Sequence, residues 1–322
     1  MLLYVAHIYT TEYKSVETGN HLFLIDNPLS WTSMFYRLLA YHPDLAWFSQ
    51  WSLRNSKISG RTYIPLVNFL DKYGRCVDLP WSKVTSMKGL NWFIYRIIPS
   101  PSDGGNIWDW IFPVLKQKTP YERDQNVASG VLPTCGHDSI HEIKKRLYFV
   151  LGKILRDQGK SRILAKRPIL IYVMPIIAQL LPNTKFVHII RDPRAFCLSS
   201  LKKGPILEYF ENIHDAVCMF ANYWLNTIKF LEQCQDKIGR DKVITLRYED
   251  MIEDIPSTLE QIYSFADLTS SHLITKKIPD KIFNTNNLYF RKANSKHIKL
   301  IEDITGNYLV KYGYKPWTER SK

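Results

Sequence analysis

The chain lacks several features that would point to a membrane, a repeat or a metal. No apolar run approaches the length needed to cross a bilayer, and there is no internal repeat or low-complexity tract. The start of the chain has neither the basic residues nor the small-residue cleavage site of a secretory signal. Its five cysteines form an odd set without a Cys-x2-Cys spacing, which is typical of reduced thiols. We therefore expect no membrane span, no disulfide framework and no metal site.

What the chain has in excess is positive charge. Lys and Arg number 43 against 30 Asp and Glu, a net charge of +13, which attracts anionic ligands. The charge is densest over 276–299, where seven basic residues face the single acid Asp280. Such a run is usually a solvated face. Neither a zinc finger nor an aromatic RNA-binding signature is present, so we expect a polyanionic nucleotide rather than nucleic acid as the partner.

The hydrophobic pattern alternates between strands and helices. Short β-rich runs predict strands at 21–25, 163–165, 186–190 and 243–246. Apolar residues at helical spacing predict helices at 34–40, 141–158, 169–181, 213–231, 256–265 and 297–312. This alternation predicts a three-layer, doubly wound α/β fold with a mostly parallel sheet.

The length and the 45% hydrophobic content suit one domain over 1–322. We expect its core at about 20–50 and 160–270, a helical insertion at about 51–160, and a basic segment with a last helix at about 271–322. The insertion is rich in Trp and Tyr. These aromatic residues either line an acceptor pocket or pack a helical cap onto the sheet.

The most informative segment is the predicted strand 186–190 together with the turn and helix start after it. Arg191 comes at the strand end, Asp192 is a favourable N-cap and Pro193 a favourable first helical residue. A guanidinium beside the positive end of a helix suits a phosphate, and Ser199 comes eight residues later. The alternative is a strand-to-helix turn held by a structural ion pair.

A second anion site is predicted after the strand at 21–25. The next turn carries the hydroxyls of Ser30, Thr32 and Ser33 ahead of the predicted helix, where they and the backbone N–H groups of the helix start can wrap a phosphate or sulfate. The Gly-x4-Gly-Lys-Ser/Thr pattern of nucleoside-triphosphate loops is absent, which disfavours a nucleotide kinase.

Together these residues resemble the sulfotransferases that use 3′-phosphoadenosine 5′-phosphosulfate (PAPS). Four blocks match in the order of that family, over most of 21–268. They are Pro28–Ser33 with His42-Pro43 after its helix, Lys166–Pro168, Arg191–Arg194 with Ser199, and Arg247–Met251 with Asp254.

The resemblance implies a P-loop-like α/β fold, PAPS as co-substrate, adenosine 3′,5′-bisphosphate (PAP) as product, and no metal. The implied nucleotide-binding residues are Ser30, Thr32, Ser33, Arg191, Ser199, Tyr248, Arg291 and Lys292. Tyr248 would approach the adenine, and the Arg291-Lys292 pair would close over the 3′-phosphate, although Ala293 replaces the Gly that usually comes next. Secretory members carry a membrane anchor, so this chain is expected to be cytoplasmic.

Two departures bear on catalysis. Leu29 stands where the family usually has a cation, and Trp31 where it has Gly. Lys166 is the leading replacement for that cation, with a surface Lys as the alternative. His137 is the candidate base, while His137 and His141 lack a third ligand for zinc. The sequence thus predicts sulfuryl transfer to an unidentified hydroxyl or amine acceptor, or else a catalytically silent nucleotide-binding relative; a nucleotide kinase is the second alternative.

Overall fold

A computed structural model describes residues 16–26, 32–48, 101, 103–116, 122–130, 139–202, 208–271, 274, 278, 284–290 and 294–317. Within these residues the strands form one sheet with the order β2-β3-β1-β4-β5. Every pairing is parallel. The strands are β1 (Leu22–Asp26), β2 (Leu45–Trp47), β3 (Arg162–Lys166), β4 (Lys185–Ile190) and β5 (Val243–Arg247). This sheet confirms the predicted α/β class.

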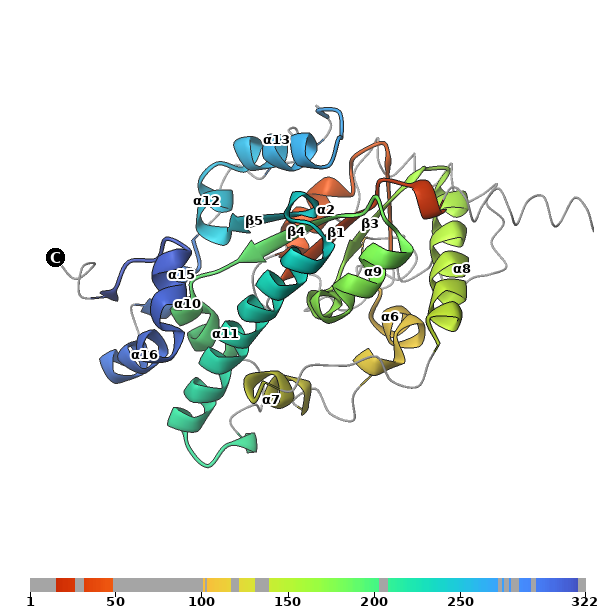
Figure 1. Ribbon diagram of the computed structural model, residues 1–322. Coiled ribbons are helices and arrows are strands. Elements are labelled where there is room, and N and C mark those ends of the chain that lie inside the picture. Colours follow the sequence, from red (N-terminus) through yellow and green to blue (C-terminus); the bar gives the residue numbers. More distant parts are fainter. Residues whose placement is uncertain are drawn as a thin grey trace, which may run out of the picture.

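Helices cover both faces of the sheet, as Figure 1 shows. One face carries α2 (Thr32–Leu39), α12 (Tyr248–Glu253) and α13 (Ile255–Phe265). The other carries α6 (Gly105–Ile111), α7 (Glu122–Ala128), α8 (Ile140–Gln158), α9 (Met174–Leu180), α10 (Pro193–Ser200), α11 (Ile213–Ile238) and α16 (Ser295–Lys311). Short helical turns lie at Pro113–Leu115, Pro168–Val173 and Arg240–Lys242, and α15 spans Asn286–Phe290.

The sheet separates two hydrophobic clusters because successive side chains of a strand point to opposite faces. In β1, Phe23 and Ile25 enter the cluster under α8 and α11, whereas Leu22 and Leu24 enter the cluster under α2 and α13. β1 is buried along its whole length. Burial on both faces explains why it reads as a continuous apolar run rather than an alternating one.

Helix ends agree with the expected signals. The Asp192 side chain accepts a hydrogen bond from the backbone N–H of Arg194 at 2.9 Å, and Pro193 opens α10. Ser139 caps α8 in the same way, by accepting from Glu142, and α8 ends at Gly159 in the left-handed conformation with φ of 63°. The start of α10 is therefore specified locally, which fixes the direction in which the chain leaves β4.

Three elements differ from expectation. β2 was not predicted, because three residues are too few to show a period. The helix predicted at 169–181 is a 3-10 segment followed by α9, since Pro175 has no N–H to bond the carbonyl of Ile171. The last helix has a kink at Gly306, whose φ of 50° is not helical.

The insertion contributes to the main core. Trp108 of α6 is fully buried, with ring centroids 4.7 Å from Phe48 and 5.9 Å from Phe23. For this residue the packing interpretation holds rather than the pocket one. Across the ranges described above, no helix is long and apolar enough to cross a membrane.

Candidate functional site

The carboxyl ends of four neighbouring strands bring the predicted site residues to one edge of the sheet. The parallel register pairs Leu24 with Lys166 and Asp26 with Ile189, so β3, β1 and β4 end side by side. Arg191 comes directly after β4, and Tyr248 directly after β5. After β1 the chain forms β2 and then β3, which both lie on one side of β1. It then continues to β4, which lies on the other side of β1. Such a reversal of strand order is where ligands bind in open α/β sheets.

On one side of this edge, Lys166 meets the first loop. Its Nζ donates a hydrogen bond to Ser33 Oγ at 3.1 Å, and the Lys166 side chain is largely buried. Thr32 Oγ1 donates to Asp26 Oδ2 at 2.5 Å, which ties the first residue of α2 to the end of β1. The structure therefore brings together Thr32, Ser33 and Lys166, and it uses the single hydroxyl proton of Thr32 to anchor the loop.

On the other side, Arg191 is only 2% exposed and its guanidinium is held in place. Nε donates to Asn286 Oδ1 at 2.9 Å, and Nη2 donates to Thr285 Oγ1 at 3.0 Å. The guanidinium carbon lies 5.0 Å from the ring centroid of Tyr248 and 5.5 Å from that of Tyr289. Burial lowers the pKa of Arg191 from its ordinary value, and the surrounding tyrosines and acids oppose that shift.

Tyr248 and Ser199 complete the described part of this group. Tyr248 is fully buried, and its hydroxyl lies 3.2 Å from Thr285 Oγ1, so Arg191 and Tyr248 share one partner. Ser199 lies in α10, 4% exposed, and its hydroxyl donates to the carbonyl of Phe196 at 2.9 Å. A phosphate contact from Ser199 therefore requires its hydroxyl proton to turn away from the helix backbone.

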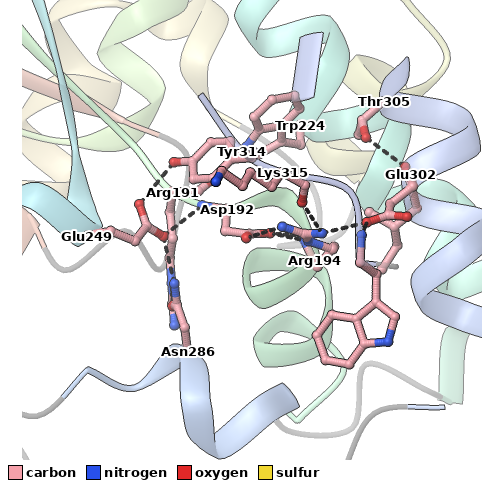
Figure 2. Close-up of polar contacts among 12 residues, drawn as sticks. Arg191, Asp192, Arg194, Trp224, Glu249, Asn286, Glu302, Thr305, Tyr314 and Lys315 are labelled. Carbon is pink, nitrogen blue, oxygen red and sulfur yellow. Dashed lines mark hydrogen bonds and ion pairs between the residues drawn. The ribbon is translucent and has the colours of Figure 1, made fainter. Parts of the chain in front are cut away.

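This turn holds a buried ion pair between Arg194 and Asp192. The Arg194 side chain donates to both carboxylate oxygens of Asp192, at 2.9 and 2.7 Å, and both residues are buried. Arg194 Nη1 also donates to Glu302 and to the carbonyl of Lys315 (Figure 2). Although burial alone lowers the pKa of Arg194, these acids raise it above its ordinary value. Arg194 thus fastens α10 to α16.

The guanidinium of Arg191 is contacted by two residues that were not predicted from the sequence. Asn286 and Thr285 hold the guanidinium of Arg191, and they are separated from it by 95 and 94 positions. Glu249 in turn accepts from Asn286 Nδ2 at 2.6 Å. Contacts over such separations leave no periodic or local signal in the sequence.

Several predicted residues lie outside the described ranges, namely Ser30, His137, Arg291 and Lys292, together with Leu29 and Trp31. His42 is described and buried; its ring lies 2.8 Å, by Nε2, from the carbonyl of Thr269. His42 therefore has a packing role. Where side chains are described, no group of three or more His, Cys, Asp or Glu could hold a metal ion.

Comparison with known proteins gives a consistent result. Residues 123–272 match the model of the sulfotransferase family. Over 124 residues the chain is 33% identical to a putative protein-tyrosine sulfotransferase of Caenorhabditis briggsae, a match covering 38% of this chain and 43% of that protein. Over 185 residues it is 21% identical to omega-hydroxy-beta-dihydromenaquinone-9 sulfotransferase Stf3 of Mycobacterium bovis, covering 54% and 46% respectively. The chain thus spans less than half the length of these curated relatives.

Solved structures share the fold. Sulfotransferase STF9 from Mycobacterium avium superposes with a TM-score of 0.60 at 15% identity, covering 96% of this chain and 81% of that one. Sulfotransferase STF1 from Mycobacterium tuberculosis gives 0.59 at 14% identity, covering 92% and 79%.

Proposed function

Because residues 123–272 match the model of the sulfotransferase family, we propose that this chain transfers a sulfuryl group from PAPS to a hydroxyl or amine acceptor. The observation that carries the proposal is the pair of cations at the carboxyl edge of the sheet. Lys166 lies against the first loop at the end of β3, and Arg191 lies beyond the intervening β1 at the end of β4. A nucleotide with a phosphosulfate at one end and a 3′-phosphate at the other matches two separated cations.

Arg191 is proposed to bind the 3′-phosphate. Its guanidinium is fixed by Asn286 and Thr285 before any ligand arrives, so little rotamer entropy is lost on binding. Tyr248, with its ring beside the guanidinium, is proposed to lie near the adenine. Ser199 and the Arg291-Lys292 pair are the further phosphate contacts that the family resemblance implies.

Lys166 is proposed to act at the sulfuryl group, with Ser33 as its partner in the first loop. In the reaction the acceptor oxygen or nitrogen forms a bond to sulfur, while the bond from sulfur to the bridging oxygen breaks and its electron pair leaves with PAP. An ammonium near the bridging oxygen stabilises that developing negative charge. The proton of the acceptor passes to a base, for which His137 is the candidate.

The names of the similar proteins concern oxygen acceptors, a protein tyrosine in one case and the omega-hydroxyl of a menaquinone in the other. We therefore favour a hydroxyl over an amine for this chain. The experiment is incubation with PAPS carrying labelled sulfur and a panel made of a tyrosine-containing peptide, a phenol, a long-chain alcohol, a sugar and an amine. Labelled product with any hydroxyl acceptor supports the proposal.

The competing function is nucleotide binding without transfer, which the replacements Leu29 and Trp31 motivate. A Leu29→Arg variant separates the two. Transfer by the natural chain supports the enzyme, whereas transfer that appears only in Leu29→Arg supports a silent relative. Tight magnesium-dependent ATP binding would instead support a nucleotide kinase.

A further inference from the structure

Glu249 receives hydrogen bonds from three segments that are distant in the sequence. Its Oε1 accepts from the backbone N–H of Asp192 at 3.1 Å and from Asn286 Nδ2 at 2.6 Å. Its Oε2 accepts from the hydroxyl of Tyr314 at 3.0 Å. Figure 2 shows these bonds converging on the Glu249 carboxylate from α10, from α15 and from the segment after α16. The two side-chain donors are buried, Asn286 at 3% and Tyr314 at 1% exposure.

All three partners donate, so the carboxylate is used as a pure acceptor, which is the ionised form. Burial raises the pKa of Glu249, while the hydrogen bonds from Asp192 and Asn286 act against that shift. Burial also raises the pKa of Tyr314, which keeps its phenol protonated and able to donate. A buried carboxylate is costly unless its oxygens are satisfied, and here both are.

The orientation of the Asn286 amide is the consequence that matters. An amide has one accepting and one donating end, and a contact at one end decides where the other points. Because Nδ2 donates to Glu249, Oδ1 faces Arg191 and accepts from its Nε at 2.9 Å. Without an acceptor at residue 249 the amide loses one of the two contacts that fix its orientation, and only the bond from Arg191 Nε opposes a turn that would present its NH2 group to the guanidinium.

We infer that Glu249 is a positioning residue for Arg191, acting through Asn286, and that Tyr314 links the segment after α16 to the same relay. The inference rests on the proposed function, since it assigns to Arg191 the recognition of a 3′-phosphate. Glu249 touches no reacting atom in this scheme. It sets the direction of the guanidinium before the nucleotide binds.

The test compares two nucleotides that differ only in the 3′-phosphate, PAP and adenosine 5′-phosphate. In Glu249→Ala we expect PAP to bind about tenfold or more weakly, because a misdirected cation loses a charge-assisted pair. Adenosine 5′-phosphate should bind with less than a twofold change. Asp250→Asn is the matched control, because it removes an adjacent acid that is 63% exposed and lies 3.7 Å from Arg247. It should leave both affinities unchanged.

A purely structural role predicts a different pattern. Glu249→Ala would then lower the melting temperature and leave the ratio of the two affinities as in the natural chain, and that result overturns the inference. Should Glu249→Ala fail to fold, Asn286→Ala tests the same relay while the Glu249 carboxylate keeps its bonds from Asp192 and Tyr314. In Asn286→Ala the ratio of the affinity for PAP to the affinity for adenosine 5′-phosphate must also fall. If this ratio is unchanged in folded Asn286→Ala, the inference is wrong.

A second readout needs no nucleotide. In 15N NMR the Arg191 Nε–H should exchange slowly with solvent in the natural chain and faster in Glu249→Ala, where its acceptor is held by one contact fewer. Equal exchange in both proteins refutes the positioning role. Failure of the natural chain to bind PAP refutes the proposed function instead, and the exchange measurement still decides whether residue 249 orients residue 191.

Discussion

Lys166 and Ser33 are joined by a hydrogen bond of 3.1 Å, which connects the end of β3 to the first turn of α2. The bond places an ammonium at the part of the first loop where the family resemblance implies the phosphosulfate. It also identifies Lys166 as the candidate for the cation that the family usually has at position 29. We propose that this strand-end Lys supplies the cation in place of residue 29.

Replacement of Lys166 by Ala should lower kcat for sulfuryl transfer by about 10² to 10³, because one donor aimed at a developing negative charge is removed. Lys185→Ala is the control, since Lys185 stands at the first residue of β4, toward the opposite edge of the sheet. The measurement is initial rate with labelled PAPS at saturating acceptor. A kcat within twofold of the natural chain for Lys166→Ala would remove the catalytic role of this residue.

Removal of Arg194 from its buried ion pair with Asp192 should destabilise the fold. Arg194→Met removes the bidentate partner of the buried Asp192 carboxylate, which costs on the order of 3 to 5 kcal/mol in the free energy of unfolding. Arg240→Met is a matched control, because Arg240 and Asp236 also lie 2.7 Å apart but are mostly exposed, so its cost is below about 1 kcal/mol. Urea unfolding monitored by circular dichroism measures both.

A double variant sharpens that test. Asp192→Asn removes the negative charge that the loss of Arg194 leaves without its bidentate partner, and Asn still provides an N-cap for α10. Added to Arg194→Met, it should therefore recover part of the lost stability. If the double variant is less stable than Arg194→Met alone, the loss comes from packing of the Arg194 stem and the charge argument is wrong.

Stability should fall as the solution becomes acidic, through two buried imidazoles. Burial lowers the pKa of His188 to about 3 and that of His21 to about 4, from 6.5 in the unfolded chain. Below pH 6.5 the unfolded state binds protons that the folded state does not. Their contribution is therefore complete above that pH and is lost as the pH falls, at up to about 1.4 kcal/mol per pH unit for each imidazole, and the slope for His21 weakens as the pH nears 4.

The His188→Gln variant checks this dependence. Between pH 6 and 4, the slope of the unfolding free energy against pH should be smaller in His188→Gln than in the natural chain, by the contribution of one imidazole. Above pH 7 the slopes of the two proteins should agree. Urea midpoints at half-unit steps of pH provide the curve. An unchanged slope at acidic pH would mean that His188 takes up its proton inside the fold.

Much of the fold could be predicted because its signals are local. Four of the five described strands contain short β-rich apolar runs, and α8 and α10 carry their own caps in Ser139, Gly159 and Asp192. β2 could not be predicted, since its three residues are placed by pairing with β3 rather than by a pattern of their own. The break before α9 was predictable in principle from Pro175.

The candidate site likewise has residues that could be predicted from the sequence and residues that could not. Arg191 and Lys166 stand at strand ends, so parallel pairing alone predicts that they share one edge of the sheet. The acceptors that hold Arg191 were not predictable, because Asn286 and Thr285 lie 95 and 94 positions away in the sequence. The partnership of Glu249 with Tyr314 joins positions 65 residues apart and likewise has no local signature.

Isothermal titration of the natural chain with PAP, with ATP and magnesium in parallel, tests the central claim most directly. We predict saturable binding of PAP and much weaker binding of ATP. Arg191→Ala should weaken PAP binding by about 2 to 5 kcal/mol, as expected when one partner of a buried charge pair is truncated. Equal affinity for PAP in the natural chain and in Arg191→Ala, or preference for ATP, would contradict the account.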